Sequence, residues 1–309
     1  MATTPHVDFG YNPPTGNRLI ERVEGPTFVR DLEHVLDIAV QHFSSLWVSD
    51  HFMTEDRFRM ECWTQLSWLA ARYPGPLLGT IVMANSYRHP PLLAKMAASL
   101  QVFSHGRFIL GYGAGWTEEE YLAYGYEFPR TPVRIAQMVE GIEVIRALWT
   151  EPRATYHGEY YDLIDAWCEP KPVPLIPIMI GGDGERFLLR AVAEHADWWN
   201  ELTKSIPVLR HKMGVLKAHC DDVGRDFGSI RKTYTFTAYL ARSKAAAVTR
   251  AGPALDREFP PFAGTPTELI DHIHELVDVG FDLFQMVFPD FPETTDMELF
   301  AGEVMPAFR

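Results

Sequence analysis

Short runs typical of β-strands alternate along this chain with longer stretches whose apolar residues recur at helical spacing. Nearly every predicted strand is followed by a predicted helix, and this order indicates a parallel sheet, because parallel strands need crossover connections. The eight predicted strands begin at Val7, Ser45, Leu77, Arg107, Ile176, Asp197, Lys232 and Asp282. Eight parallel strands close naturally into a barrel, so the pattern predicts an α/β fold of the (β/α)8 TIM-barrel class rather than an open doubly wound sheet.

The chain length fits one large barrel as well as two smaller domains. Its 309 residues would give two units at about 150 residues per domain, but α/β barrels commonly form one unit of about 250 residues or more. No clear domain boundary or low-complexity tract is evident. We therefore expect a single barrel domain over residues 1–309, with insertion segments at 151–174 and 251–264. Such connections are either lids or partner contacts over the active-site face, or plain surface excursions, and the sequence leaves both open.

Two predicted helices have clear apolar faces, and two have recognisable start signals. The face residues are Ile135, Met138, Val139, Ile142, Ile145, Leu148 and Trp149 in one helix, and Leu269, Ile273, Leu276 and Val277 in the other. Thr117 followed by Glu120, and Thr265 followed by Glu268, both fit a capping box, in which each side chain binds the other residue's backbone N–H. The two patterns predict helices that begin just after Thr117 and Thr265.

Charge and the length of the apolar runs restrict the possible partners. With 28 Lys+Arg against 41 Asp+Glu, the net charge is -13, so we expect binding neither to nucleic acid nor to anionic membranes. The longest apolar runs are strand-sized, well below the roughly 20 residues that span a bilayer. Three scattered cysteines and the lack of a secretory signal at the start predict a cytoplasmic protein. No cysteine pair has metal-site spacing, and we predict no metal.

Polar residues that directly follow strands are the first candidates for function, because a barrel carries its active site at the carboxyl ends of its strands. Asp50 and His51 follow the strand predicted to begin at Ser45. An imidazole can exchange a proton near neutral pH, and a neighbouring carboxylate can orient it. Asp50 as a helix cap beside a packed His51 explains the same position equally well. Position alone therefore leaves both interpretations of His51 open.

Two glycine-rich loops follow two later strands. The first, residues 111–117, resembles a G-x-G-x-x-G motif, but Trp116 stands where the third glycine is required, so a Rossmann assignment fails. The second, residues 181–184, follows the next predicted strand. Glycine lets the backbone approach a ligand and present N–H groups to an anion, so the two loops predict a phosphate site. A tight turn between a strand and a helix requires glycine as well.

Other enzyme classes fit the sequence less well. It contains neither H-E-x-x-H nor G-x-S-x-G, the commonest signatures of zinc and serine hydrolases. A barrel glycoside hydrolase needs paired carboxylates, for which Asp50 and Glu201 are candidates, but it leaves the two glycine loops without a function. A non-catalytic barrel that only binds a cofactor is a further alternative.

Five segments of the chain together resemble the bacterial-luciferase-like superfamily of flavin- and deazaflavin-dependent oxidoreductases. They are SDHF (49–52), TIVMANSYRHPPLLAKMAASL (80–100), SHGRFILGYGAGWTEEEYLAYGYEF (104–128), YYDLIDAWCEPKPV (160–173) and IMIGGDGERFLLRAVAEHADWWN (178–200). The segments GRFILGYGAGW and IMIGG are the most specific. The GxGAGW loop followed by EEE is more similar to the branch that uses coenzyme F420 than to the luciferases themselves.

The resemblance implies a TIM barrel that binds its cofactor ring at the carboxyl ends of the strands. His51 matches the family's active-site histidine, and Asp50 matches its cofactor-contacting neighbour. The strand over residues 80–84 matches one that carries a non-proline cis peptide behind the ring, which we place near Ile81–Val82. The other residues that the resemblance assigns to the cofactor are Ile81, Val82 and Ala84 beside the ring, and Gly113, Ala114, Gly115, Trp116, Gly181, Gly182 and Asp183 around the phosphate.

The leading hypothesis is an F420-dependent oxidoreductase that moves a hydride between the deazaflavin and a small organic substrate, with His51 as acid or base. The same scaffold with reduced FMN and O2 would be a monooxygenase. F420-dependent glucose-6-phosphate dehydrogenases of this family carry an acidic residue in place of Trp116, so we expect a neutral or apolar substrate instead. Phe9, Tyr11 and Trp47 either line its pocket or belong to the core. The resemblance also implies a homodimer.

Overall fold

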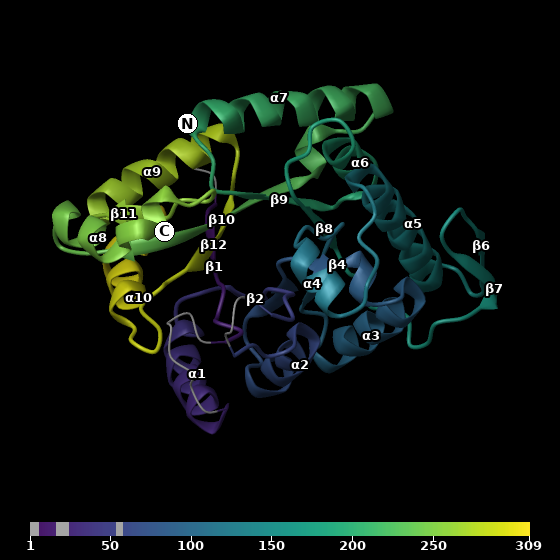
Figure 1. Ribbon diagram of the computed structural model, residues 1–309, viewed down its shortest axis with the longest axis horizontal. Helices are drawn as coiled ribbons and strands as arrows, with labels where there is room; N and C mark the ends of the chain where they lie inside the picture. The colour runs from purple at the N-terminus through teal and green to yellow at the C-terminus, as the bar shows by residue number, and fades with distance from the viewer. Residues whose placement is uncertain (1–5, 17–24, 54–57) are drawn as a thin grey trace.

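Eight parallel strands form a closed barrel in the computed structural model, which describes residues 6–16, 25–53 and 58–309 (Figure 1). The strands are β1 (Asp8–Tyr11), β2 (Ser45–Val48), β3 (Leu77–Thr80), β5 (Phe108–Gly113), β8 (Ile178–Gly181), β9 (Trp198–Leu202), β10 (Arg231–Leu240) and β12 (Leu283–Val287). They pair in this order around the barrel, and β12 pairs back with β1. Each strand begins within two residues of its predicted start, so the predicted (β/α)8 barrel is confirmed.

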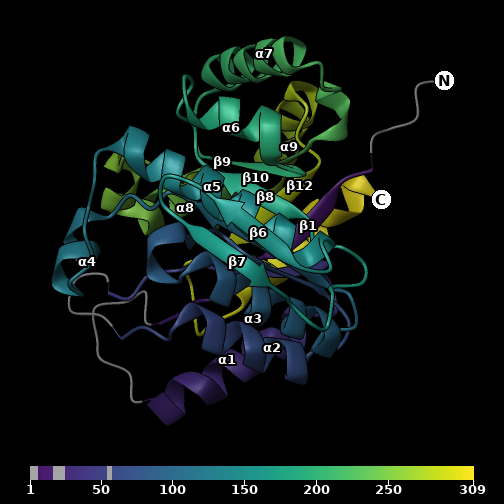
Figure 2. The ribbon, with the colours of Figure 1, turned by 90° about the vertical axis from the view of Figure 1, so that its right-hand side faces the viewer.

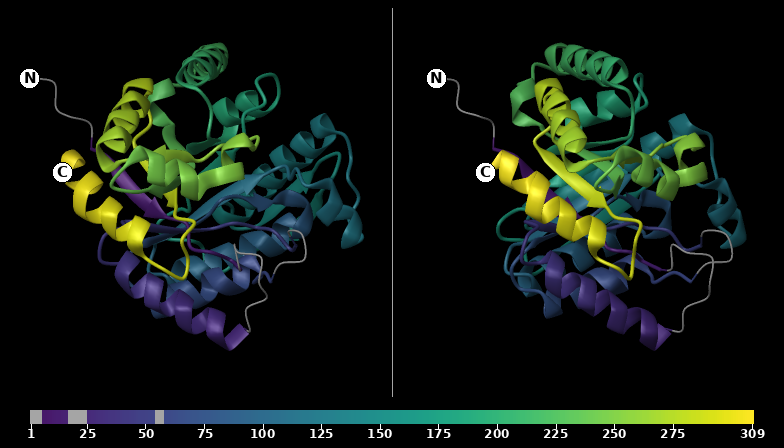
Figure 3. Two further views of the ribbon diagram at one scale, coloured as in Figure 1. Left: turned by 60° about the vertical axis from the view of Figure 1, so that its left-hand side comes forward. Right: turned by 90° about the vertical axis from the view of Figure 1, so that its left-hand side faces the viewer.

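The α-helices of the described residues surround this barrel (Figure 2). They are α1 (Gly25–Ala39), α2 (Cys62–Arg72), α3 (Pro90–Phe103), α4 (Glu118–Ala123), α5 (Thr131–Thr150), α6 (Leu188–His195), α7 (Ile206–Val223), α8 (Lys244–Ala251), α9 (Pro266–Val279) and α10 (Thr295–Leu299). The predicted apolar faces of α5 and α9 are buried, except that Val139 and Val277 are half-buried. Past α10, Phe300 and Phe308 pack their rings against Phe9, which places the C-terminal segment beside β1 (Figure 3). None of these helices is long and apolar enough to cross a membrane.

Two short strands extend the barrel sheet at its carboxyl edge. After β3, the non-proline cis peptide lies between Ile81 and Val82, and β4 (Met83–Ala84) then pairs with the end of β5. Farther along the chain, β11 (Phe262–Gly264) pairs with the last residues of β10. The insertion predicted at 251–264 therefore lies on the side where the strands end, which is the side expected to carry the site.

The other insertion forms a hairpin outside the barrel. Its strands β6 (Ala154–His157) and β7 (Asp162–Ala166) are antiparallel, and the hairpin lies beyond α5 (Figure 1). The carboxylate of Glu140 on α5 accepts backbone N–H groups of residues 159–161 at the hairpin tip. The Tyr161 hydroxyl at the same tip accepts a hydrogen bond from Asn85 at 3.0 Å, so these contacts leave both alternatives for residues 151–174 open.

Trp47 fills the inside of the barrel rather than a substrate pocket. It is fully buried and packs with Ile109, Met179 and Leu283. A Cβ on Gly10 would come within 2.5 Å of the Trp47 ring, so the barrel interior needs glycine there to hold the indole. Phe9 and Tyr11 are likewise buried in the main core. Of the two alternatives for these three aromatics, the structure supports the core.

Candidate functional site

His51 lies just beyond the carboxyl end of β2, and the carboxylate of Glu120 holds its ring. Nδ1 of His51 is 2.9 Å from Oε2 of Glu120 on α4. The backbone N–H of Met53 donates to the other oxygen of Glu120 at 3.1 Å, and the Tyr87 hydroxyl donates to Oε2 at 3.3 Å. Glu120 is almost fully buried, whereas a quarter of the His51 side chain is exposed. One nitrogen of the imidazole is thus fixed while the ring remains accessible.

Hydrogen bonds keep the buried Glu120 carboxylate ionised. Burial by itself raises the pKa of Glu120. The hydrogen bonds from His51, Met53 and Tyr87 lower the pKa by more than burial raises it, so the pKa is below the usual value. The phenol of Tyr87 responds in the opposite direction. Burial, followed by the negative charge of Glu120, raises the pKa of Tyr87 well above its usual value. Near neutral pH, Glu120 therefore accepts hydrogen bonds and Tyr87 donates one.

Trp116 is an exposed aromatic side chain beside His51. The centroids of the two rings are 5.9 Å apart and the rings are perpendicular, while the Trp116 residue is 67% exposed. Gly115, which precedes it, has a φ of +73°, and a Cβ there would overlap the hydroxyl of Tyr121. The turn that presents Trp116 therefore requires glycine. An indole left in water next to a histidine offers a surface to a flat or apolar ligand.

Asp50 is next to His51 in the sequence, but its carboxylate belongs to a different network. It accepts from the Arg88 guanidinium at 2.8 and 3.1 Å and from the backbone N–H of Ala84 at 3.1 Å. Arg88 also pairs with Glu61, the N-cap residue of α2. The network ties the end of β2 to β4 and α2. Because both oxygens of Asp50 are engaged, Asp50 is not free for the acid/base role that a glycoside hydrolase would need.

Glu201, the second carboxylate of that alternative, lies on β9 in a separate charged cluster. Burial raises the pKa of Glu201 to about 7, and the charge of Asp183 adds to this rise. The lysines of the same cluster, Lys204 and Lys212, oppose it. Oε2 of Glu201 is buried and has no hydrogen-bond partner in the described part of the chain. The two carboxylates therefore have different partners, and the geometry does not support the glycosidase alternative.

Packing explains two of the glycines that were candidates for a phosphate site. A Cβ on Gly113 would come within 2.7 Å of the Val82 side chain, and a Cβ on Gly181 within 2.8 Å of it. Val82 follows the cis peptide and fills the space that both glycines leave open. Glycine is thus required at these strand ends by the chain's own packing, and by itself it does not indicate a phosphate.

The loop after β8 has other features that suit an anion. Within the described residues, the backbone N–H groups of Asp183 and Gly184 have no hydrogen-bond acceptor. Nζ of Lys204 and of Lys212 lie 3.3 and 3.4 Å from the Asp183 carboxylate, and the Lys204 side chain is a quarter exposed. Free N–H groups beside the partly exposed ammonium group of Lys204 can hold a phosphate.

The loop after β5 suits an anion less well. Residues 113–116 lead directly into α4, whose first turn carries Glu118, Glu119 and Glu120. Three carboxylates at this helix start repel a phosphate there. Of the two loops to which the resemblance assigned the phosphate, the one over residues 181–184 therefore fits better.

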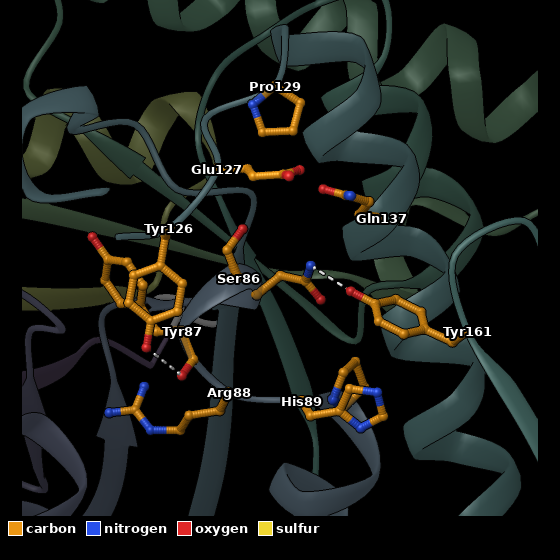
Figure 4. A pocket seen from close by; sticks show the side chains of 11 residues that line it. Ser86, Tyr87, Arg88, His89, Tyr126, Glu127, Pro129, Gln137 and Tyr161 are labelled. Atoms are coloured by element: carbon orange, nitrogen blue, oxygen red, sulfur yellow. Dashed lines mark hydrogen bonds between the residues drawn. The ribbon is translucent and has the colours of Figure 1, made fainter. Parts of the chain in front are cut away.

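A polar pocket of about 350 Å³ borders these networks. Tyr87 and Arg88 line it, together with Ser86, His89 and Gln137 (Figure 4). Tyr87 and Arg88 thus connect the pocket with Glu120 and Asp50, respectively. No group of three or more His, Cys, Asp or Glu side chains that could hold a metal ion occurs in the described residues.

The structure brings His51, Trp116 and the cis peptide strand to one end of the barrel, but it also shows partners that the sequence did not indicate. Glu120 was expected to complete a capping box with Thr117, and this prediction is wrong, because Thr117 makes no side-chain cap. Instead Glu120 reaches His51 across 69 residues. No spacing in a single sequence indicates a pair that far apart.

The closed parallel barrel, with a histidine and its carboxylate beyond β2, defines a TIM-barrel protein whose candidate site lies at the carboxyl ends of the strands. Comparison with known families identifies the group more closely. The family model described as luciferase-like monooxygenase matches residues 7–263. The chain belongs to this family.

Individual relatives are similar over shorter stretches or at lower identity. An F420-dependent glucose-6-phosphate dehydrogenase of Kineococcus radiotolerans is 36% identical over 148 residues, which cover 47% of this chain and 44% of the relative. The chain therefore spans about half the length of this curated relative. An F420-dependent secondary alcohol dehydrogenase, solved with an F420-acetone adduct, superposes with a TM-score of 0.84 at 18% identity over 98% of this chain and 99% of that one. A monooxygenase from Streptomyces bottropensis superposes with a TM-score of 0.81 at 20% identity over 98% and 100%. At such identities the structures support the fold alone.

Proposed function

We propose that this protein is an F420-dependent oxidoreductase that transfers a hydride between the cofactor and a small organic substrate. The observation that carries the proposal is the His51–Glu120 pair at the carboxyl end of β2, with the exposed Trp116 beside it. The family match and the F420-dependent relatives support the choice of cofactor. An imidazole held by a buried carboxylate is suited to exchange a proton with a group bound at the barrel mouth.

The residues at the barrel mouth fit the proposed cofactor. When bound, F420 supplies a deazaflavin ring that accepts or donates a hydride. Ile81, Val82 and Ala84 would support the ring from the side of the cis peptide. The N–H groups of Asp183 and Gly184, with Lys204, would hold the phosphate. Because the chain carries a net charge of -13, these local donors have to hold an anionic cofactor against an unfavourable overall field.

His51 and Trp116 would act on the substrate directly. His51 would give or take the proton that accompanies hydride transfer, and Trp116 would cover the reacting groups and exclude water. A neutral or apolar substrate fits this site, because Arg88 is paired with Asp50 and the proposal assigns Lys204 to the cofactor phosphate. Neither cation is then left to bind a phosphate on the substrate.

The proposal includes a homodimer. An apolar groove of about 510 Å³ lies between α2 and α3 and is lined by Trp63, Leu100 and Phe103. Phe103 is 76% exposed. A second copy of the chain would cover such a groove, and analytical ultracentrifugation measures the dimer directly. Sedimentation as a monomer at micromolar concentration would contradict this part of the proposal.

Equilibrium titration with each cofactor tests the proposal. We expect F420 to quench the intrinsic fluorescence of the tryptophans with saturation, because Trp116 lies at the proposed ring site. Tight binding of FMN without any response to F420 would overturn the proposal in favour of a flavin-dependent monooxygenase. Turnover with F420 is then followed on a panel of alcohols, ketones and enones, with glucose 6-phosphate as the charged comparison. We expect His51→Ala to bind F420 but to lose turnover by about 10²–10⁴-fold.

A further inference from the structure

The carboxylate of Glu120 meets three donors at once, and their geometry dictates the state of His51. An ionised carboxylate has only acceptor sites. Nδ1 of His51, at 2.9 Å from Oε2, must therefore carry a proton to make this hydrogen bond. When the ring is neutral, its single proton then resides on Nδ1, and Nε2 keeps a lone pair. Nε2 has no hydrogen-bond partner in the part of the chain that the structure describes.

We propose that Glu120 is a positioning residue, which fixes His51 in the tautomer protonated on Nδ1 and thereby makes Nε2 the atom that exchanges a proton at the site. The first half of this proposal stands on the contacts of Glu120 alone. The second half, proton exchange at Nε2, rests on the proposed function.

The surroundings of Glu120 make it the carboxylate that faces the His51 ring. The Tyr87 hydroxyl donates to the same oxygen as His51, and Met53 donates its backbone N–H to the other oxygen, so both oxygens are engaged. Asp50 does not compete for the ring, because Arg88 and Ala84 engage its carboxylate. Glu120 is therefore the carboxylate that orients the imidazole, as the partners of catalytic histidines do in general.

The start of α4 has no side-chain cap, because Glu120 contacts His51 instead of the backbone of Thr117. In a capping box, Glu120 would bind the backbone N–H of Thr117, and the Thr117 hydroxyl would bind that of Glu120. Neither bond forms, and the Thr117 Oγ1 is buried without a partner within the described residues. A role confined to α4 would have been met by the capping box, whereas the observed contact reaches His51.

The tautomer of His51 can be measured in the protein without cofactor. In nitrogen NMR at alkaline pH, where histidine rings are neutral, a protonated and an unprotonated ring nitrogen give well-separated signals. The chain has 12 histidines, and the signals of His51 are assigned by their loss in His51→Gln. We expect Nδ1 to be protonated in the wild type. A proton on Nε2 instead would overturn the proposal, and this measurement needs no variant of Glu120.

The variant Glu120→Gln should invert the tautomer. The N–H of Met53 cannot become an acceptor, so the amide oxygen of Gln must face Met53 and its NH2 group must face His51. Nδ1 would then have to accept, and the proton would move to Nε2. Glu119→Gln removes the same charge from the next, exposed position of α4 and is expected to leave the tautomer unchanged. An unchanged tautomer in folded Glu120→Gln would overturn the proposal.

Kinetics with F420 separate the two halves. We expect Glu120→Gln to lower kcat by about 10²-fold or more with little change in KM or in F420 affinity, and Glu119→Gln to change none of them. Unchanged kcat in a variant with an inverted tautomer would overturn the role of Nε2. If the wild type bound no F420, the proposed function and the second half would fail together, while the wild-type tautomer would still decide the first half.

Discussion

Helices α4 and α9 begin with the same sequence pattern, Thr-x-x-Glu, and use it differently. At α9, Thr265 and Glu268 bind each other's backbone N–H groups at 3.3 and 3.0 Å and form a complete capping box. At α4, Glu120 turns to His51, and the Thr117 hydroxyl is left without a partner among the described residues. One pattern thus stabilises its own helix, whereas the other serves a site.

The difference follows from what surrounds each glutamate. Glu268 is partly exposed, and its other carboxylate oxygen accepts from the ammonium of Lys244 at 2.9 Å. Glu120 is buried against the end of β2, where three donors need an acceptor. A carboxylate that satisfies three donors in a buried place is more stable there than at one backbone N–H. A local motif that fails for a tertiary reason therefore points to a functional place in the fold.

The loop that leads into α4 should show the largest effect. In Gly115→Ala, the new Cβ would overlap the Tyr121 hydroxyl at a φ of +73°, and we expect a loss of about 2–5 kcal/mol in unfolding free energy. Gly125→Ala, beyond the other end of α4, has a φ of +77° and open space around its Cβ, so it isolates the backbone strain, about 1–2 kcal/mol. Urea denaturation measures both. Equal losses in the two variants would show that the Tyr121 side chain moves away from the new Cβ at little cost. The packing around Gly115 would then be looser than its geometry indicates.

Removal of Glu120 should have the next largest effect. Glu120→Ala leaves His51, Met53 and Tyr87 without their acceptor in a buried place, and we expect a loss of about 2–4 kcal/mol near neutral pH. Glu268→Ala at α9 removes an exposed carboxylate and should destabilise the protein less. A larger loss at Glu268 than at Glu120 would reverse the comparison of the two helices.

The contribution of Glu120 should depend on pH with a definite sign. Its pKa in the folded protein is lower than the usual value of 4.5. The ionised form is thus favoured by folding, so its stabilisation is complete above the unfolded pKa and is lost as pH falls through the folded pKa. The difference in unfolding free energy between the wild type and Glu120→Gln should therefore shrink when the pH is lowered from about 7 to about 3. The other acidic groups are the same in both proteins, so their contributions cancel in this difference in unfolding free energy. If the difference stayed constant down to low pH, the stabilisation would not come from ionised Glu120.

The sequence predicted the barrel because its signals are local. Apolar runs marked each of the eight strands, and Thr265 with Glu268 marked a helix start that the structure confirms. For the candidate site, position after a strand made His51 one of two open alternatives, and the family resemblance then assigned it the role of the active-site histidine. The partners of His51 and Asp50 were not predicted, because Glu120 and Arg88 lie 69 and 38 residues away. The pairing of donors with acceptors depends on how β2, β4 and α4 pack in the folded protein. The spacing of residues along the sequence does not indicate this packing.

The cap at α9 should have a moderate effect. Thr265→Val keeps the branched shape but removes the oxygen that accepts the N–H of Glu268. We expect a loss of about 1 kcal/mol in unfolding free energy, the usual contribution of a helix cap. Urea denaturation at neutral pH gives the value. No measurable loss would mean that the capping box contributes little to stability at α9. The capped start of α9 and the uncapped start of α4 would then not differ in energy.

The matched change at α4, Thr117→Val, should have the smallest effect. Its hydroxyl is buried and unpaired in the described part of the chain, so its removal relieves a desolvation cost and breaks no hydrogen bond. We expect the unfolding free energy to stay within about 0.5 kcal/mol of the wild type or to rise. A loss as large as that of Thr265→Val would mean that the hydroxyl has a partner in solution. Measuring F420 binding by the same variant tests a separate role of the hydroxyl, because Thr117 directly follows the loop that the family resemblance assigns to the cofactor. Weaker F420 binding at unchanged stability would show that the Thr117 hydroxyl contacts the cofactor, just as Glu120 contacts His51 instead of its own helix start.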